Sequence, residues 1–341
     1  MEVFERSYNM KIDFVIPWVD GNDPLWQNER SRYRADETAD ACAARYRDMG
    51  ILKYWFRAVE AYAPWVNQVH FITWGHLPEW LNIEHPKLRI VNHKDYIPAE
   101  YLPTFSANPI ELNLHRIPGL SEHFVYFNDD VFLNGPVLPD FFFHKGLPCD
   151  FANLDNIYCE RPDDAYPHIL FNESHLISKH YSYIRAFCKS PGKYLNIAYS
   201  VKANLKNLLK LENWNCFPGF VEHHLAAPYR KQMFAELWAK DYHTLDQASK
   251  SKFRSAFDLG QRVFRYAQLA SGEFFPVSPS SRGKNMNILS PVDSIEATLK
   301  DSKIPMVCLN DTSFDIDFEQ KMAQIVAIYE KKLSTKSSFE K

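Results

Sequence analysis

Ile12-Asp-Phe-Val-Ile-Pro-Trp-Val19 is a short apolar run that leads directly into Asp20-Gly21-Asn22-Asp23-Pro24, a dense cluster of turn-forming residues. This pattern predicts a buried strand that opens into a loop. From Ile51 onward, apolar residues recur at helical spacing until Pro64, which cannot continue a helix. The strand signal then returns in three apolar runs, Val69 to Trp74, Leu88 to Val91 and Phe124 to Phe127.

Strands that alternate with helices predict an α/β fold with a mostly parallel sheet and helices on both faces. In such a sheet, ligands bind in the crevice beyond the carboxyl ends of the strands. We expect residues 11–140 and 221–335 to form this core, residues 141–220 to form a smaller, mainly helical accessory region, and residues 1–10 and 336–341 to be tails. Three local expectations follow from the later sequence: a helix that begins at Pro228, a loop from Ser278 to Asn287, and a closing helix that contains Met322, Ile325, Val326 and Tyr329.

The bulk composition excludes several classes of protein. A chain of 341 residues with 46% apolar residues can bury a large core. A net charge of −3 and the absence of a long Lys/Arg run argue against a nucleic-acid partner. No stretch reaches the ~18 apolar residues of a membrane span, and the six cysteines contain no CxxC pair. We therefore expect a cytoplasmic protein with reduced thiols, soluble or attached to the inner face of the plasma membrane.

Two side-chain stripes occupy one predicted helix in the accessory region. Val201, Leu205, Leu208 and Leu209 form an apolar stripe, and Lys202, Lys206 and Lys210 form a basic one. An ordinary solvated face and an interface with anionic lipid both fit this pattern.

Asn128-Asp129-Asp130 lies at the predicted tip of a strand, where a ligand would bind. Two adjacent carboxylates at such a place suit a hard divalent cation, Mg²⁺ or Mn²⁺, that neutralises diphosphate oxygens. A turn capped by its own Asx side chains fits the residues equally well. Asp20-Gly21, at the end of the first strand, has the same two interpretations, a nucleotide contact or a plain turn.

Other polar residues offer chemistry without a decisive motif. His224, which follows His223 in a loop, could act as a general base, because the pKa of histidine lies near neutrality. Arg254 and Asp258 lie one helical turn apart and could be a simple ion pair or a phosphate-binding arginine held by its acid. Asp48 and Asp311 lie in polar loops, where capping is the ordinary role. The phosphate-binding patterns GxGxxG and GxxxxGK[ST] are both absent.

Read in order, these segments resemble the conserved regions of the Stealth family of hexose-1-phosphate transferases. The resemblance covers roughly residues 11–333. The first region resembles Ile12 to Pro24. The remaining matches are Arg45-Tyr-Arg-Asp48, Tyr62-Ala-Pro-Trp65, Leu102 to Ser106, Glu111, His115-Arg116-Ile-Pro-Gly-Leu120, Tyr126 to Asp130, His168 to Asn172, His224 with Pro228, Arg254 with Asp258, and Val307-Cys-Leu-Asn-Asp311.

The resemblance implies a Rossmann-like, GT-A-like core that binds a nucleotide sugar, usually a UDP-sugar. A glycan hydroxyl would attack the phosphorus nearest the sugar, UMP would leave, and a phosphodiester would form during synthesis of a capsule or cell-surface polysaccharide. By the same resemblance, His224 is the base, Arg254 the cation and Asp130 a third catalytic residue, with the metal on Asp129 and Asp130. Nucleotide-sugar contacts fall on Asp20, Gly21, Arg47, Asp48, Asn128, His115 and Arg116, and further candidates are Asp258, Asn310, Asp311 and Asn172. Residues 141–220 would lie on the acceptor side, and within them the stretch from about Cys149 to Pro218 matches the family poorly.

Two other functions remain open on the sequence. A metal-dependent glycosyltransferase would use a related nucleotide-sugar site but break the bond at the anomeric carbon. A non-catalytic glycan-binding module would account for the eight Trp and 18 Tyr, since aromatic rings stack on sugars.

Overall fold

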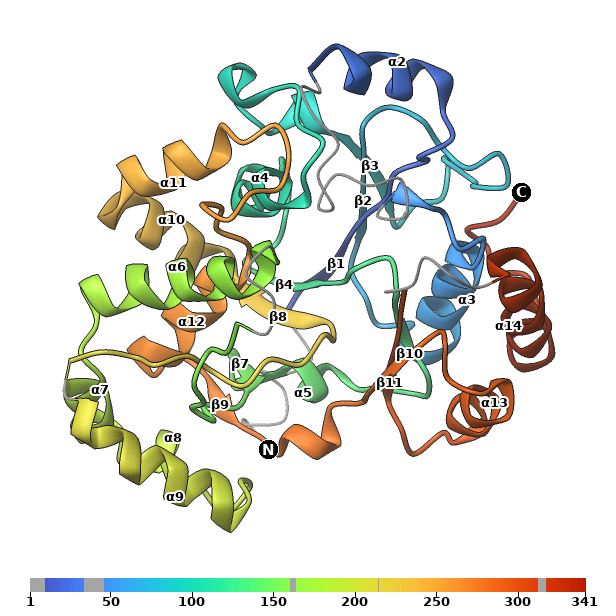
Figure 1. The fold of residues 1–341 in the computed structure, drawn as a ribbon. Coiled ribbons are helices and arrows are strands. Elements are labelled where there is room, and N and C mark those ends of the chain that lie inside the picture. Colours follow the sequence, from blue (N-terminus) through green and yellow to red (C-terminus); the bar gives the residue numbers. More distant parts are fainter. Residues whose placement is uncertain (1–9, 34–45, 160–163, 214, 312–316) are drawn as a thin grey trace.

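A five-stranded sheet in the order β3-β2-β1-β4-β8 forms the centre of the protein (Figure 1). The computed structural model describes residues 10–33, 46–159, 164–213, 215–311 and 317–341. The first four strands are parallel, and β8 runs antiparallel to β4 at one edge. The structure therefore confirms the α/β class and the mostly parallel sheet. These strands are β1 (Ile12–Pro17), β2 (Val69–Thr73), β3 (Leu88–Asn92), β4 (His123–Tyr126) and β8 (Ala227–Arg230).

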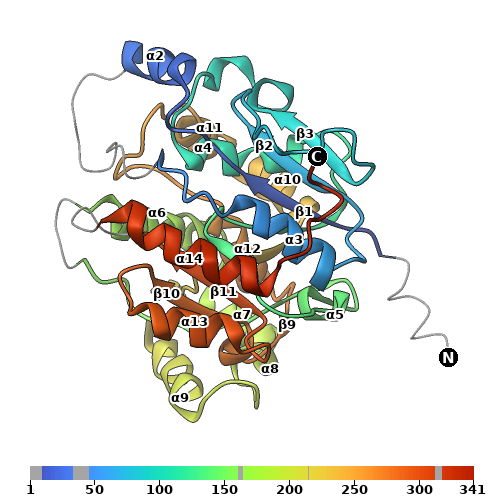
Figure 2. The same cartoon turned by 90° about the vertical axis from the view of Figure 1, so that its right-hand side faces the viewer.

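Helices cover both faces of this sheet, as expected, because successive side chains of each buried strand point to opposite faces. Phe14 and Ile16 of β1 belong to one core cluster, with residues of α3 (Leu52–Tyr62) and α14 (Phe318–Lys332). Val15 belongs to a second cluster, with residues of α4 (Ala107–Leu112), α10 (Lys231–Lys240) and α12 (Arg262–Ser271). In Figure 2, α3 and α14 lie in front of β1.

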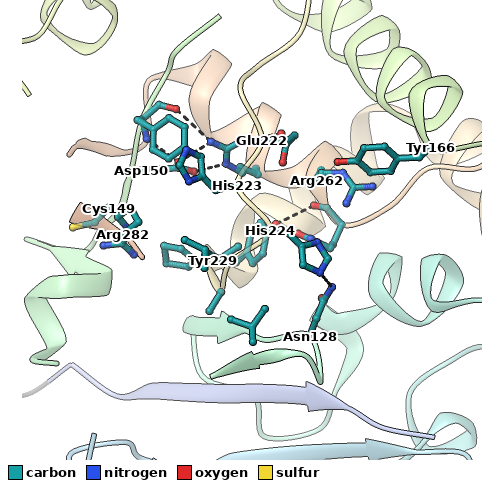
Figure 3. Close-up of a pocket in the computed structure, with 18 residues that line it drawn as sticks. Asn128, Cys149, Asp150, Tyr166, Glu222, His223, His224, Tyr229, Arg262 and Arg282 are labelled. Atoms are coloured by element: carbon teal, nitrogen blue, oxygen red, sulfur yellow. Dashed lines mark hydrogen bonds and ion pairs between the residues drawn. The ribbon is translucent and has the colours of Figure 1, made fainter. Parts of the chain in front are cut away.

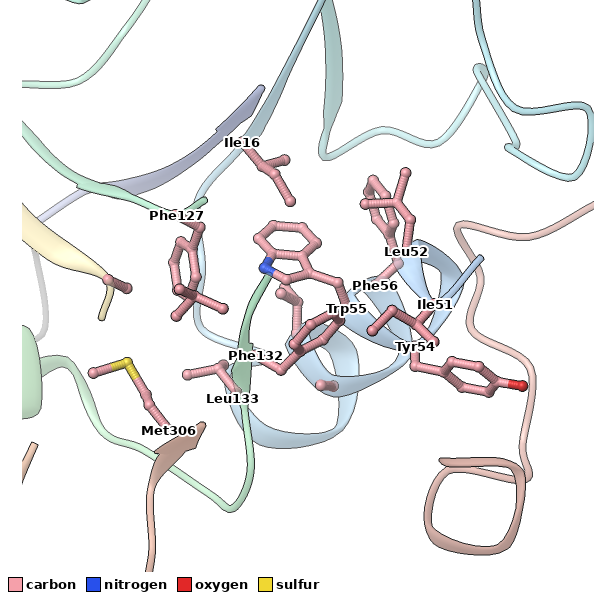
Figure 4. Close-up of a cluster of buried hydrophobic side chains, with 14 of the residues drawn as sticks. Ile16, Ile51, Leu52, Tyr54, Trp55, Phe56, Phe127, Phe132, Leu133 and Met306 are labelled. Carbon is pink, nitrogen blue, oxygen red and sulfur yellow. The ribbon is translucent and has the colours of Figure 1, made fainter. Parts of the chain in front are cut away.

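Packing in the first cluster fixes the point at which the chain leaves β4. Trp55 is fully buried and makes edge-to-face contacts with Phe56 and Phe127, at centroid distances of 5.0 and 5.3 Å (Figure 4). The backbone N–H of Phe127 donates to the carbonyl oxygen of Val15 at 2.9 Å. Since Asn128 follows directly, this packing sets the origin of the Asn128-Asp129-Asp130 segment.

A small sheet in the order β10-β11-β5 lies beside the main one. β11 (Met306–Asn310) runs antiparallel to β5 (Val131–Leu133), and Cys308 pairs with Val131. The N–H of Leu309 donates to the carbonyl oxygen of Asp130 at 2.9 Å. A segment almost 180 residues away in the sequence is thereby held against Asp130.

The segment from 141 to 220 contributes several helices and part of a third sheet, β6-β7-β9. Leu176, Ile177 and Tyr183 of this segment belong to the second core cluster, together with residues of α10 and α12. The remaining elements are α2 (Pro24–Tyr33), α5 (Pro139–Phe142), β6 (Phe143–His144), β7 (Leu147–Asp150), α6 (Ala165–His180), α7 (Tyr183–Lys189), α8 (Pro191–Tyr194), α9 (Val201–Leu209), α11 (Tyr242–Ser249), β9 (Phe275–Pro276), β10 (Lys284–Asn287), α13 (Val292–Lys300), η3 (His93–Asp95), η4 (Ala99–Tyr101), η5 (Leu114–Arg116), η6 (Lys210–Asn213) and η7 (Pro279–Ser281).

Two local expectations were wrong, while the closing helix is confirmed as α14. Pro228 lies inside β8, and the helix begins three residues later at Lys231. An edge strand tolerates proline because it does not need every backbone donor. The expected loop from Ser278 to Asn287 contains β10, which is paired with β11.

The carboxyl-terminal residues 336–341 are not a free tail. Phe339 is buried in the first core cluster. The Glu340 carboxylate forms an ion pair with Arg57 at 2.8 Å, and both side chains are at most 5% exposed. This pairing satisfies a buried guanidinium of α3, which explains why a polar segment packs there. The expected tail at residues 1–10 lies outside the described part, apart from Met10.

The described helices include none that is long and apolar enough to cross a membrane. Five of the six cysteines lie in the described part of the chain, and all five are free thiols.

Candidate active site

Asp20, Gly21 and the segment that contains Asp48 meet beyond the carboxyl end of β1. The Asp20 N–H donates to His76 Nε2 at 2.8 Å, and the Asp20 carboxylate accepts from the N–H of Asn22 at 2.9 Å. A Cβ on Gly21 would lie 2.1 Å from the carbonyl oxygen of Tyr46, so only glycine permits this approach. Burial raises the pKa of Asp48, and the negative charge of Asp20 adds to the effect.

Asp129 joins this group of acids from the end of β4. Desolvation by the surrounding protein, together with the charges of Asp130 and Asp48, raises the pKa of Asp129 to about 7. Its side chain nevertheless keeps access to solvent. The carboxylates of Asp129, Asp48 and Asp20 therefore form an acidic centre, and Asp130 adjoins it. Carboxylate oxygens are the ligands that hard divalent cations prefer, and such cations also keep several waters. No three of these four carboxylates place their oxygens within 4.8 Å of one another, so a cation here would be held partly through water.

Asp130 has a second set of contacts. Its Oδ2 lies 3.0 Å from His224 Nε2, and the Cys308 thiol donates to the same oxygen at 3.4 Å. Asn128 Nδ2 lies 3.2 Å from the same imidazole nitrogen. Burial favours the neutral imidazole, but the hydrogen bond and the charge of Asp130 outweigh it and raise the pKa of His224. The acid thus stabilises the protonated form of a histidine at the strand end.

The tautomer of His224 follows from its contact with the Asp130 carboxylate, to which Nε2 donates. The Asn128 amide nitrogen, itself a donor, is only a neighbour of Nε2. An ionised carboxylate only accepts hydrogen bonds, so Nε2 carries a proton that it donates to Asp130. Nδ1 then remains as the proton-accepting nitrogen of the neutral ring. The His224 side chain is 36% exposed, and His224 lines a pocket at the strand ends. The geometry is that of an acid and histidine pair in which the acid orients the base.

The pocket beside His224 contains cationic and aromatic side chains (Figure 3). Arg262, at the start of α12, lies 5.1 Å from the ring of Tyr166, and its Nε lies 3.4 Å from the buried Glu173. Burial raises the pKa of Glu173 to about 7. The described residues that line the pocket are Asn128, Val131, Cys149, Asp150, Phe151, Tyr166, Glu222, His223, His224, Leu225, Ala226, Ala227, Pro228, Tyr229, Gln261, Arg262, Arg265 and Arg282.

Two of the predicted residues, Asp258 and Asn172, do not line the pocket but form hydrogen bonds that hold a neighbouring loop. Asp258 is buried and accepts hydrogen bonds from Asn108 at 2.9 Å and Ser251 at 2.6 Å. Asn172 donates to the carbonyl oxygens of Ala256 and Asp258. These contacts hold the loop of Arg254, which is not helical, so the expected one-turn spacing of Arg254 and Asp258 was wrong. The Arg254 guanidinium lies 5.8 Å from the centroid of the Tyr166 ring, which Arg262 also approaches.

Arg47 and Asp311 form an ion pair at 2.6 Å. The Arg47 guanidinium also stacks on Phe318, 3.6 Å from the ring centroid. This pair joins the segment of Asp48 to the end of β11. Asn310, the last residue of β11, pairs with Asn287 of β10.

His115 and Arg116 are not brought to the acidic centre. The His115 ring packs on Phe234 and Trp238 of α10, at 6.0 and 5.9 Å, and the Arg116 guanidinium lies 4.7 Å from Trp238. Burial, followed by the charges of Arg116 and Lys231, lowers the pKa of His115 to about 3. Lys231, whose charge acts on His115, donates its backbone N–H to Glu122, just before the amino end of β4. Asp129 follows the carboxyl end of β4, so His115 and the acidic centre lie at opposite ends of this strand.

Sequence reasoning missed Arg262, Tyr166 and the contact of Cys308 with Asp130. Arg262 and Tyr166 belong to no motif, and their place in the pocket depends on how α12 packs against α6. The pairing of β11 with β5 brings Cys308 to Asp130, and a sequence pattern does not specify strand order.

Comparison with known proteins identifies the family. Residues 10–38 match the family model described as Stealth protein CR1, conserved region 1, and residues 45–149 match Stealth protein CR2, conserved region 2. A capsular polysaccharide phosphotransferase WcwK from Streptococcus pneumoniae is 41% identical over 97% of this chain and 99% of its own length. The chain belongs to the Stealth family.

The receptor polysaccharide phosphotransferase WefC of Streptococcus gordonii is 38% identical to this Stealth protein, over 97% of the chain and 99% of the relative. These full-length relatives are phosphotransferases, so this Stealth protein is a transferase enzyme. The galactosyltransferase LgtC is similar in structure with a TM-score of 0.38 and 11% identity, over 92% of this chain and 95% of that chain.

Proposed function

We propose that this enzyme transfers a hexose-1-phosphate or N-acetylhexosamine-1-phosphate from a UDP-sugar to a hydroxyl of a growing capsule or cell-surface glycan. The acceptor oxygen forms a bond to the phosphorus nearest the sugar, the bond from that phosphorus to the UMP oxygen breaks, and UMP leaves. The hydroxyl proton goes to His224. The observation that carries the proposal is the Asp130–His224 pair, which lies at a pocket beside the acidic centre of Asp129, Asp48 and Asp20.

Each residue has a role that its contacts support. Asp130 holds the Nε2 proton of His224, so Nδ1 can accept the proton of the attacking hydroxyl. Arg262, near Tyr166 in the pocket, stabilises charge on the transferred phosphoryl group. Asp129, with Asp48 and Asp20, would hold Mg²⁺ or Mn²⁺. A bound cation neutralises diphosphate oxygens. Asp130 therefore orients the base rather than binding the metal.

The released nucleotide tests the reaction. Purified enzyme is incubated with a panel of UDP-sugars, glycan acceptors and Mg²⁺, and the nucleotide product is separated by chromatography. Sugar-phosphate transfer releases UMP and gives a phosphodiester signal in the phosphorus NMR spectrum of the glycan. A glycosyltransferase, the alternative enzyme, would release UDP and leave no such signal. Release of UDP alone would contradict the proposal.

Metal binding should depend on pH through Asp129. A carboxylate binds a cation only when it is deprotonated, and the pKa of Asp129 is about 7. The affinity for Mn²⁺ should therefore rise about tenfold per pH unit below 7 and level off above it. Asp129→Asn should weaken Mn²⁺ binding by about 100-fold or more, as measured by isothermal titration calorimetry. Full activity after exhaustive chelation would rule out the metal requirement.

A stability measurement without metal provides the control for this variant. A raised carboxyl pKa means that the folded state binds the proton more tightly than the unfolded state, so stability is lost as pH rises from the ordinary value of 3.8 toward about 7. Asp129→Asn has no titrating carboxyl group at this position, so its stability does not fall in this pH range for that reason. Its thermal midpoint should therefore exceed that of the wild type at pH 8 and approach it at low pH. A lower midpoint at pH 8 would show that the carboxylate is structurally required.

We also propose that α9 attaches the enzyme to an anionic membrane surface. Val201, Leu205 and Leu209 are 86%, 55% and 61% exposed, whereas the polar Asn207 is the buried residue of this helix. Asn207 bonds to the backbone of Leu154 and Tyr194. The helix is therefore anchored by its polar side and presents its apolar side outward, opposite to an ordinary surface helix.

Charge around α9 supports an anionic partner. Residues 174–211 contain seven Lys or Arg residues and no Asp or Glu. Lys206 and Lys210 reach Asp155 and Asn156 beside the apolar stripe. The basic residues are Lys179, Arg185, Lys189, Lys193, Lys202, Lys206 and Lys210. Lys179 and Lys206 form ion pairs with Asp241 and Asp155, at 2.7 Å each, so their charges are partly neutralised. Each other basic group near an anionic surface contributes about 1 kcal/mol to binding.

Vesicle co-sedimentation tests this attachment. The enzyme should bind phosphatidylglycerol vesicles at low salt and dissociate from them at high salt. It should not bind phosphatidylcholine vesicles. Val201→Asp with Leu205→Asp should weaken binding by about tenfold or more, a loss of at least ~1.4 kcal/mol. Leu138→Asp, at a site 73% exposed and outside α9, is the matched control and should bind normally. Concentration-dependent dimers that the double variant abolishes would instead assign this face to a second copy of the chain.

A further inference from the structure

Three potential metal ligands of different chemistry meet at the base of the pocket. One ligand atom each from Asp130, His224 and Cys308 lies within 4.8 Å of the others. His224 Nε2 and Cys308 Sγ lie 3.0 and 3.4 Å from Asp130 Oδ2. The three residues come from separate segments, the turn after β4, the loop before β8, and β11. Two backbone interactions hold Cys308 beside Asp130, the pairing of Cys308 with Val131 and the hydrogen bond from Leu309 to Asp130.

The two separations from Asp130 Oδ2 are close to those around a small tetrahedral cation, and the third ligand pair lies within 4.8 Å. In zinc sites the nitrogen, oxygen and sulfur ligands lie about 2.0–2.3 Å from the metal, which places neighbouring ligand atoms about 3.3–3.8 Å apart. The two observed distances to Asp130 need to change by only a few tenths of an ångström. Three protein ligands also leave a fourth position toward the pocket that His224 lines.

We propose that Asp130, His224 and Cys308 form an inhibitory site for Zn²⁺ or a similar thiophilic divalent cation, distinct from the Asp129 centre. A thiolate and an imidazole favour Zn²⁺, whereas Mg²⁺ demands oxygen ligands. The acidic centre of Asp129, Asp48 and Asp20 offers oxygen only. The two sites therefore separate hard from borderline-soft cations within one active site.

Occupation of this site blocks proton transfer. The Cys308 thiol loses its proton to solvent when it ligates the cation. An imidazole that ligates through Nε2 carries its own proton on Nδ1, so His224 can no longer accept one from the acceptor hydroxyl. Asp130 is diverted from Nε2 to the cation at the same time. Zn²⁺ should thus lower kcat in the presence of saturating Mg²⁺. This effect on turnover rests on the proposed role of His224, whereas binding of the cation does not.

Cobalt spectroscopy tests the site without any turnover. Co²⁺ replaces Zn²⁺ and gives a near-ultraviolet charge-transfer band when a thiolate ligates it. The background protein carries Ser at Cys42, Cys159, Cys188 and Cys216, so that Cys149 and Cys308 remain. This protein should show the band, Cys308→Ser should remove it, and His224→Gln should weaken Co²⁺ binding. Cys149→Ser is the matched control, because Cys149 is also buried, lines the same pocket and donates to the Asp140 carbonyl oxygen.

The outcomes separate this site from the proposed reaction. Absence of the band, or its persistence in Cys308→Ser, would overturn the zinc site whether or not the enzyme transfers sugar phosphate. With an active wild type, Cys308→Ser should raise the inhibitory Zn²⁺ concentration by about 10–100-fold. Equal inhibition of Cys308→Ser and wild type would also overturn it. Failure of UMP release from every UDP-sugar would contradict the proposed function and leave the cobalt result standing.

Discussion

His224→Ala is expected to lower kcat for sugar-phosphate transfer by about 10²–10⁴-fold, the range for loss of a general base. The expected change in KM is small, because the imidazole acts on the proton of the reacting hydroxyl rather than on substrate binding. Single-turnover release of UMP measures the effect. His223→Ala is the matched control, since its ring packs edge-on against Phe151 at 4.8 Å and burial lowers its pKa. Equal losses in both variants would mean that His224 is not the base.

The pH profile provides a second measurement of the same pair. A base must be neutral to act, so the rate should rise as pH increases through a pKa above the ordinary 6.5 of histidine. Asp130→Asn removes the charge that raises this pKa, and the inflection should move to lower pH. The variant should also lose activity, because an amide can accept or donate and no longer fixes the tautomer. An unmoved inflection would show that another group controls the profile.

The sequence predicted the sheet, and the edge of the sheet at which a ligand would bind, because those features depend on local patterns. The apolar runs at Ile12 and Phe124 became β1 and β4, and the polar residues that follow them meet beyond the strand ends. Turn chemistry and strand burial are encoded within a few residues of each other. The same locality explains why α3 and α14 were predicted from their apolar spacing.

Features that depend on distant contacts were not predictable in this way. Pro228 favours a helix start locally, but pairing with β4 places it in an edge strand. The segment 336–341 is polar, but the buried Arg57 needs its carboxylate. The assignment of Arg254 as the cation stays a prediction, and the sequence did not indicate that Arg262 lines the pocket, because its place there depends on the packing of α12 on α6. These features depend on tertiary contacts, and a single sequence without an alignment carries little information about such contacts.

Arg262→Ala is expected to lower kcat by about 10³-fold or more, the scale for an arginine that stabilises phosphoryl-transfer charge. The guanidinium lies near Tyr166 and Glu173 in the pocket beside His224. Its positive charge also opposes the rise in the pKa of His224 that Asp130 causes. Charge on the transferred group grows in the transition state, so the loss should appear in kcat more than in KM.

Two variants distinguish this role from a structural one. Arg262→Lys keeps the charge but loses the planar, bidentate donor, so it should recover only part of the rate. Arg254→Ala, in the loop that Asp258 and Asn172 hold, compares the two arginines that approach Tyr166. Because Arg262 pairs with the buried Glu173, the alanine variant is checked by its thermal midpoint, and Arg262→Ala with Glu173→Gln removes the buried charge left behind. If that double variant folds normally and retains wild-type kcat while Arg254→Ala is inactive, the phosphoryl cation is Arg254.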